Sequence, residues 1–379
     1  MQRIYFDHAA TTPLDKRVLD KMLPYFTELY GNADSPHQTG RRAMAAVDAA
    51  RDLIAERLGA KKNEIYFTSG GTESGNWAML GAARARRKEG KTRVILSSVE
   101  HHALLSSAER LQNEGFEIVY LPVNEGGRVE VNALKEAITD TTALVAVMTA
   151  NNETGVLQPI EECGELAHSH GALFFTDATQ AAPYMPIDTS AWNADMIAFS
   201  AHKFYGPKGA GVLYIKNGVR TEKLIGGGEQ ERGLRGGTLN VPNIVGLAEA
   251  YRLAIDEMAE SNEKLQGLSA LFRKETAKIR GITRNGDSEN ALPSVLNLRI
   301  EGVENTAFLY NMDLRGVSLA AGSACASASV KPSHVLTAMG LREREAKESV
   351  RFSLGKNNTE EEIVRGTALM REVVERLRG

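Results

Sequence analysis

Leu144-Val145-Ala146-Val147-Met148 and Leu173-Phe174-Phe175 are two short, continuously apolar runs near the middle of the chain. Runs of this kind are typical of parallel strands that are buried on both faces of a sheet. Similar runs alternate with helical patterns between about residues 64 and 216, at 64–68, 93–96, 117–121, 196–199 and 211–215. Repeated β-α-β units predict an α/β fold with a mainly parallel, doubly wound sheet. The functional site of such a sheet is expected beyond the carboxyl ends of its strands.

The pattern changes after about residue 240. A long helical stretch carries apolar residues from Leu253 to Ile279 at helix-like spacing, and two more strand candidates follow it. The last helix opens with a capping box at Thr359. We predict a large α/β domain over residues 13–250 and a smaller α+β domain over 251–379, which the N-terminal segment 1–12 joins.

Composition excludes several classes of protein. Lys and Arg number 45 and Asp and Glu number 48, and this balance lacks the basic surface that nucleic-acid binding requires. No apolar run approaches the roughly 18 residues that span a bilayer, and the first residues lack the apolar core of a signal peptide. The 379 residues include only two cysteines, which indicates a reducing compartment. We expect a cytoplasmic protein that binds neither nucleic acid nor membrane.

A lysine directly after the strand candidate at 196–199 is the first candidate catalytic residue. Lys203 follows Ser200 and His202 and precedes a Gly/Pro turn. An ε-amine beside a buried sheet can lose part of its hydration and form a Schiff base with an aldehyde cofactor. Taken alone, the pattern also fits a surface lysine.

Two other segments favour the cofactor hypothesis. Asp177 ends a buried strand, where a carboxylate needs a cationic partner, and the ring nitrogen of pyridoxal phosphate (PLP) is one. A structural Asp that caps a loop is the alternative. Ser69-Gly70-Gly71-Thr72-Glu73-Ser74 lies at a strand-to-helix junction, where backbone N–H groups and hydroxyls can bind a phosphate. The loop at 69–74, Asp177 and Lys203, in this order along the chain, together predict a PLP site. No spacing of His, Cys and Asp residues indicates a metal site.

With these residues the chain resembles the cysteine desulfurases of the NifS/IscS type, in the class V branch of the fold-type I PLP enzymes. The resemblance runs nearly from end to end, and its ordered set of motifs is very specific. The matching segments are DHAATT (7–12), YGN (30–32), EHHA (100–103), NNETG (151–155), DATQ (177–180), SAHK (200–203), GGGEQERG (226–233), RGGT (235–238), GSAC (322–325) and SVRFSLG (349–355).

The resemblance implies a role for each candidate residue. Lys203 would bind PLP covalently, Asp177 would pair with the ring nitrogen, and His101 would stack on the ring and move protons. Arg351 would bind the substrate carboxylate through its planar fork, and Asn32 would lie in the substrate loop. The other implied cofactor ligands are Gln180 and Asn152 near the phenolic oxygen, and Gly71, Thr72, Ser200, His202 and, from a second subunit, Thr238 at the phosphate.

The activity that the resemblance implies is the conversion of L-cysteine into L-alanine. Sulfur would pass to Cys325 as a persulfide, and then to an acceptor protein such as an iron–sulfur scaffold or a tRNA-thiolation enzyme. The resemblance also implies a homodimer, because Thr238 would complete the phosphate site of the neighbouring subunit.

The surroundings of the two cysteines differ. Cys325 lies in the run of small residues 320–329, between a strand candidate and Pro332, which favours a mobile loop with an exposed thiol. A buried structural cysteine is the alternative. Cys163 lies on a predicted helix beside acidic residues, which disfavour its thiolate, and we interpret it as a bystander.

Three other functions remain possible for this sequence. A class V aminotransferase on the same fold needs no nucleophilic cysteine, and a selenocysteine lyase would discriminate against cysteine. A non-catalytic sulfur-carrier platform belongs to a different class, and intact Lys203, Asp177 and Arg351 argue against it.

Overall fold

The computed structural model describes residues 3–322 and 332–379, so Cys325 lies outside the described residues. The strands are β1 (Ile4–Tyr5), β2 (Ile65–Thr68), β3 (Arg93–Ser97), β4 (Glu117–Leu121), β5 (Thr142–Ala146), β6 (Leu173–Asp177), β7 (Met196–Ser200), β8 (Gly211–Ile215), β9 (Ile282–Asn285), β10 (Val295–Ile300), β11 (Val317–Ser318) and β12 (Ser349–Ser353). The α-helices are α1 (Lys16–Met22), α2 (Pro24–Thr27), α3 (Gln38–Leu58), α4 (Gly71–Asn76), α5 (Ala82–Arg87), α6 (His102–Asn113), α7 (Val131–Ala137), α8 (Ile160–Ser169), α9 (Val241–Asp256), α10 (Met258–Thr276), α11 (Asn305–Leu314), α12 (His334–Ala338), α13 (Glu343–Lys347) and α14 (Glu360–Arg378).

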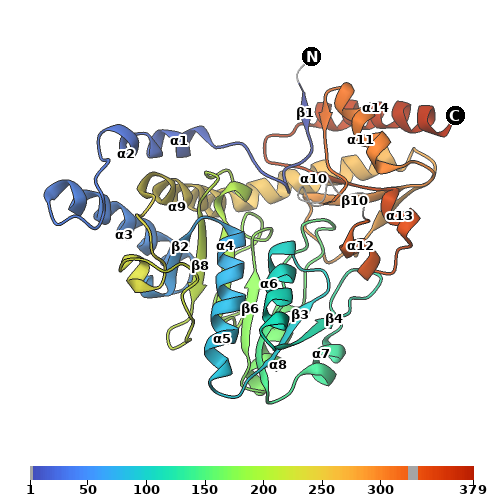
Figure 1. Cartoon of the computed structure of the whole chain (residues 1–379). Coiled ribbons are helices and arrows are strands. Elements are labelled where there is room, and N and C mark those ends of the chain that lie inside the picture. The colour runs from blue at the N-terminus through green and yellow to red at the C-terminus, as the bar shows by residue number, and fades with distance from the viewer. Residues whose placement is uncertain (1–2, 323–331) are drawn as a thin grey trace.

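A seven-stranded sheet with the order β2-β8-β7-β6-β5-β3-β4 forms the centre of the molecule (Figure 1). The strands from β7 to β4 are parallel, whereas β8 runs antiparallel to both β7 and β2. The predicted α/β class with a mainly parallel sheet is therefore confirmed.

Apolar side chains cover both faces of this sheet. One buried cluster joins the sheet to α3, α8 and α9, and a second joins the other face to the helical turn 77–81, α5 and α6. Figure 1 shows α4 and α5 following one another along one continuous helix, with α6 beside it on the near face. Burial on both faces explains why the strands read as continuously apolar runs.

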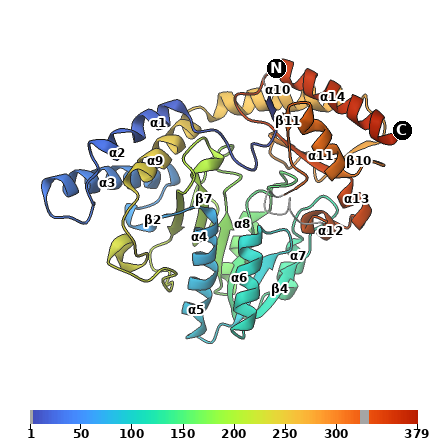
Figure 2. The same ribbon diagram turned by 45° about the horizontal axis from the view of Figure 1, so that its top comes forward.

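A separate apolar cluster lies around the antiparallel sheet β12-β10-β9, which α10, α11 and α14 cover (Figure 2). The N-terminal segment belongs to this cluster, because Ile4 and Phe6 are buried in it and β1 pairs with β11 in parallel. Thr359 and Glu362 form the predicted capping box at the start of α14. The domain limits at residues 12 and 250 remain a prediction.

The long helical stretch after residue 240 is two helices. α9 ends at Asp256 and α10 begins at Met258, with Glu257 between them. The carboxylate of Glu257 contacts Arg17 at 2.5 Å and Lys356 at 3.0 Å, so residues distant in sequence hold this break. No Gly or Pro marks the break, which is why helix periodicity alone misses it.

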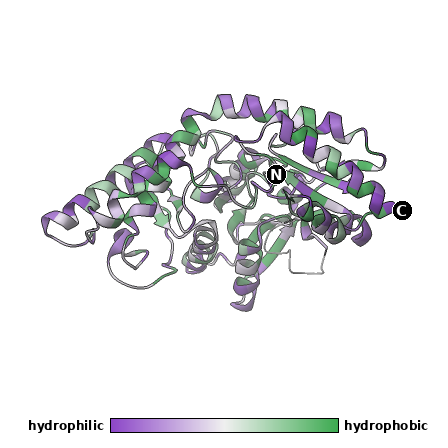
Figure 3. Cartoon of the chain, turned by 90° about the horizontal axis from the view of Figure 1, so that it is seen from above, coloured by the Kyte–Doolittle hydropathy of each residue, from purple (hydrophilic) through white to green (hydrophobic). Residues whose placement is uncertain are grey.

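The long helices α10 and α14 carry hydrophilic residues along one side and hydrophobic residues along the other (Figure 3). This amphipathic pattern is typical of helices that pack on a core with one face in water. Within residues 3–322 and 332–379, no helix combines the length and the apolar character that a membrane crossing needs.

Candidate active site

The topology of the large sheet gathers the candidate residues at one edge. Since β8 is antiparallel to both β2 and β7, these two strands point the same way, as do β3, β5 and β6. Their carboxyl ends therefore share an edge. The candidates follow these ends directly: Gly71 and Thr72 after β2, His101 after β3, Asn152 after β5, Asp177 and Gln180 at the end of β6, and Ser200, His202 and Lys203 at the end of β7.

Lys203 lies in the short helix η3 (Ala201–Lys203), and its amine faces the N-terminal segment. Lys203 Nζ donates to the carbonyl oxygens of Ala9 at 2.5 Å and Ala10 at 2.8 Å. Gln180 Nε2 donates to the same Ala9 oxygen at 3.0 Å, which brings Gln180 and Lys203 together. Thus the N-terminal segment lies across the sheet edge and orients the amine.

The backbone after Lys203 is unusual. Tyr205 has a φ of 63°, in the left-handed region that non-glycine residues rarely adopt. Thr12 Oγ1 accepts from the backbone N–H of Tyr205 at 2.8 Å, and the Tyr205 carbonyl accepts from the N–H of Asp15 at 2.9 Å. These bonds hold a conformation that costs about 1 kcal/mol or more, a feature that is common at functional sites.

Electrostatics link His101 to Asp177 and Lys203. His101 caps α6, where its Nδ1 accepts from the N–H of Ala103 at 3.2 Å, so the neutral ring carries its proton on Nε2. Burial lowers the pKa of His101, Asp177 opposes this shift and Lys203 adds to it. The imidazole is therefore neutral at pH 7 and can donate or accept a proton near both residues.

Asp177 is buried, and its Oδ1 accepts from the backbone N–H of Thr179 at 2.9 Å. This bond is the loop-capping contact of the alternative interpretation. It occupies one carboxylate oxygen and leaves the other for a second partner, so capping and cofactor binding are compatible.

The loop after β2 fits a phosphate group. Gly70 has a φ of 149°, and a Cβ atom added to Gly71 would lie 3.0 Å from Thr179 Oγ1 and 3.8 Å from Ser200 Cβ. Thr179 Oγ1 is buried and has no hydrogen-bond partner among the described residues. Helical backbone runs without interruption from Gly71 to Arg87, so its free N–H groups face this space. A small, polar cradle at a helix N-terminus suits the PLP phosphate.

His202 borders the same region. Its Nδ1 lies 3.1 Å from Thr11 Oγ1, and burial beside Lys203 lowers its pKa to about 4. The ring is consequently neutral at pH 7 and can donate a hydrogen bond to a phosphate, but it adds no positive charge.

Arg351 lies in the middle of β12 and is only 1% exposed. Its Nη2 contacts Asp7 Oδ1 at 2.8 Å, and its Nη1 donates to the carbonyl of Asn152 at 2.9 Å. Its Nε is buried and has no partner among the described residues. The structure therefore brings Arg351 and Asn152 together, and Asp7 neutralises a guanidinium that would otherwise be a buried, unpaired charge.

Thr238 and Asn32 lie apart from this group. Both are exposed, and in the described ranges neither hydrogen-bonds to another candidate residue. Gln230 links their loops, since its Nε2 donates to Asp34 Oδ2 at 2.6 Å and its Oε1 accepts from the N–H of Gly237 at 3.1 Å.

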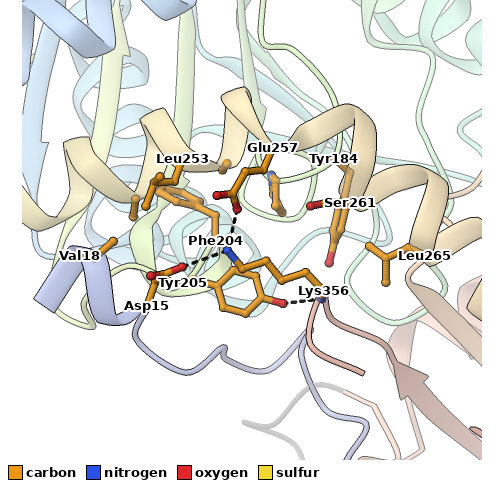
Figure 4. Close-up of a pocket in the computed structure, with 13 residues that line it drawn as sticks. Asp15, Val18, Tyr184, Phe204, Tyr205, Leu253, Glu257, Ser261, Leu265 and Lys356 are labelled. Atoms are coloured by element: carbon orange, nitrogen blue, oxygen red, sulfur yellow. Dashed lines mark hydrogen bonds and ion pairs between the residues drawn. The ribbon is translucent and has the colours of Figure 1, made fainter. Parts of the chain in front are cut away.

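A cavity of about 30 Å³ lies behind Phe204 and Tyr205 (Figure 4). Lys356 crosses it to Asp15 at 3.1 Å and Glu257 at 3.0 Å, and the Lys356 N–H donates to the Tyr205 hydroxyl at 2.8 Å. The space suits ordered water but is too small for a substrate. Through these contacts Lys356, which follows β12 of the smaller sheet, holds the loop after Lys203 in place.

Cys163 is fully buried on α8. Burial is the main reason that its pKa rises to about 12, and Glu162 adds to the rise. The sequence argument named only the neighbouring acids, so it found the right direction from the lesser cause.

Sequence reasoning assigned no role to Asp7, to the carbonyls of Ala9 and Ala10, or to Thr179. These residues lie in the matching segments 7–12 and 177–180, and that position was the only available signal. Every residue has a backbone carbonyl, so the residue types in the sequence do not reveal which carbonyls bind a lysine.

Comparisons with known proteins show which family the chain resembles. The family described as aminotransferase class-V matches residues 4–365. A cysteine desulfurase IscS of Clostridium botulinum is 48% identical over 365 residues, 96% of this chain and 92% of that protein. One of Methanosarcina thermophila is 45% identical over 375 residues, 99% of this chain and 93% of that protein.

Solved structures of related proteins have a similar fold. A NifS-like protein superposes with a TM-score of 0.93 and 35% identity, covering 99% of this chain and all of that one. A structure described as SspA in complex with cysteine superposes with a TM-score of 0.84 and 37% identity, covering 94% of this chain and all of that one.

Proposed function

Because the chain belongs to the class-V aminotransferase family and to its cysteine desulfurases, we propose that it binds PLP and converts L-cysteine into L-alanine and protein-bound sulfur. The observation that carries this proposal is the placement of the Lys203 amine at a sheet edge beside Gln180, with His101 and Asp177 in electrostatic range. The family assignment by itself names no residues, whereas this arrangement identifies the residues of this chain that would carry out the reaction.

Enzymes of this family depend on PLP, which supplies an electron sink when bound. In this chain Lys203 would hold its aldehyde carbon and the free Asp177 oxygen its ring nitrogen. Gly71, Thr72, Ser200, His202 and Thr179 would surround its phosphate, and Gln180 and Asn152 its phenolic oxygen.

Residues of this chain would orient the substrate and transfer the protons. Arg351 orients the substrate through its carboxylate, and Asp7 and the Asn152 carbonyl hold the guanidinium in place. After the substrate amine has displaced it, the freed Lys203 amine would remove the α-proton, and His101 Nε2 would move a proton near the reacting carbon atoms.

Sulfur transfer is the last step. The Cys325 thiolate attacks the substrate sulfur, so that an S–S bond forms as the C–S bond breaks. The electron pair of the broken bond stays with the substrate β-carbon, which takes a proton and becomes the methyl group of alanine. Cys325 is left as a persulfide, which an acceptor protein then discharges.

The proposed function is tested by incubating the PLP-loaded protein with L-cysteine. We expect alanine and persulfide in equal amounts during the first turnover, without any added oxo acid. An aminotransferase would require an oxo acid and form no persulfide, and a selenocysteine lyase would release alanine from selenocysteine only. A sulfur-carrier platform would show no visible absorbance from bound PLP.

We also propose a homodimer in the cytoplasm, with an iron–sulfur scaffold or a tRNA-thiolation enzyme as sulfur acceptor. Exposed apolar side chains occur every three or four residues through α1, α2 and the residues that follow α2, namely Leu19, Leu23, Phe26 and Tyr30. Contiguous exposed apolar surface is typical of a protein interface. A second copy on this surface would also explain why Thr238 and Asn32 lie apart from their own Lys203.

The dimer predicts a selective effect of charge on this surface. Phe26→Asp is expected to weaken the dimer at least about tenfold in sedimentation, because it buries an unpaired carboxylate. Leu314→Asp is the matched control, since Leu314 on α11 is 83% exposed and lies outside this surface. A fully active wild-type monomer would refute the dimer.

A further inference from the structure

Glu153 is a buried acid to which the proposed function gives no role. It is 1% exposed and lies in the loop between β5 and α8. Its backbone N–H donates to Asn151 Oδ1 at 2.9 Å, and its carbonyl accepts from Asn297 Nδ2 at 3.1 Å. Because Asn297 belongs to β10, the backbone of Glu153 is fixed from both the large and the small sheet.

The carboxylate of Glu153 binds one flank of the segment that carries Cys325 and lies close to the other. On one flank, Ser333 Oγ donates to Glu153 Oε2 at 2.5 Å. On the other, a Cβ atom added to Gly322 would lie 2.9 Å from the same Oε2, closer than real Cβ contacts. Glycine at position 322 therefore permits the close approach of the two groups.

A further contact holds the flank that contains Ser333. His334, next to Ser333, places its Nε2 3.0 Å from the backbone carbonyl of Glu100. Glu100 directly precedes His101, and Glu153 directly follows Asn152, whose carbonyl binds Arg351. Both attachment points are thus continuous with residues that we assign to the cofactor and the substrate.

We propose that Glu153 is a positioning residue for sulfur transfer, because its carboxylate holds Ser333 and packs close to Gly322, the described residues on either side of the segment that carries Cys325. The inference rests on the proposed function. A thiolate attacks productively only from a narrow range of positions, and a misplacement of about 1 Å can cost roughly 100-fold in rate. Binding of PLP and of cysteine needs no protein thiol and should not depend on Glu153.

Glu153→Ala separates these two requirements. We expect kcat for alanine formation to fall about tenfold or more, while the absorbance of bound PLP and the spectral change with L-cysteine stay as in the wild type. Glu153→Gln keeps an acceptor for Ser333 Oγ and should lose less. Glu64→Ala is the matched control, because the Glu64 carboxylate is also buried and accepts from the backbone N–H groups of Lys61 and Asn217, both at 2.7 Å, at the opposite end of β2.

A double-mutant cycle tests the contact itself. Gly322→Ala should lower kcat in the wild type through its clash with Glu153, but should have little further effect in Glu153→Ala. Additive effects, or a Glu153→Ala variant with the wild-type kcat, would overturn the inference. So would a loss of cysteine binding that accounts for the whole loss of rate. If the wild type makes no alanine from cysteine, the proposed function fails, and the inference falls with it.

Discussion

Lys203→Ala is expected to remove the visible absorbance of bound PLP and to lower alanine formation roughly 1,000-fold or more. The Lys203 amine is the group that the Ala9 and Ala10 carbonyls orient at the sheet edge, and the described neighbours offer no second amine there. Absorbance spectra and alanine assays of the purified variant measure both effects.

Lys208→Ala is the control, because Lys208 lies in the turn that follows Lys203 but is exposed. It should keep the spectrum and rate of the wild type. Normal turnover by Lys203→Ala would show that the whole site is wrongly assigned.

Cys325→Ala should bind PLP and show a spectral change with L-cysteine, yet make almost no alanine and carry no persulfide. The thiol is needed only when sulfur leaves the substrate, because the attack requires a thiolate close to that sulfur. We expect a loss of at least roughly 100-fold in alanine formation. Mass spectrometry of the intact protein after one turnover would detect the missing persulfide.

Cys163→Ala should turn over cysteine like the wild type, because burial keeps its thiol protonated. Its stability should fall by about 1 kcal/mol as a small cavity forms in the core. A Cys325→Ala variant with the wild-type rate would favour the aminotransferase, and a dead Cys163→Ala variant would identify the other cysteine as the sulfur carrier.

The large sheet was predictable because burial on both faces imposes apolar runs that periodicity detects. The exact ends of its strands, and the break between α9 and α10, were harder to predict. The predicted strand at 144–148 ends at Ala146 in the structure, where the N–H of Met148 donates to Glu100 Oε1 instead of a neighbouring strand. The break at Glu257 depends likewise on Arg17 and Lys356, so tertiary contacts override the local pattern.

The candidate site was predictable where chemistry requires a residue type at a strand end, as at Lys203 and Asp177. It was not predictable where a partner comes from elsewhere in the chain. Asp7 pairs with Arg351 across almost the whole sequence, and Glu153 contacts Ser333, which caps α12. Their identity as acids gives no indication of these partners, which only the folded topology brings together.

The N-terminal segment has a consequence for how the protein is made. These residues are synthesised before the rest of the described chain, yet Ile4 pairs with Val317 and Asp7 with Arg351. A nascent chain that stops before β12 has no partner for Asp7, and contacts of such long sequence separation form slowly. Until β11 and β12 have been synthesised, Ile4 and Asp7 have no partners. The pair of Asp7 and Arg351 therefore forms late in folding, and a chain that lacks β12 cannot complete this part of the site.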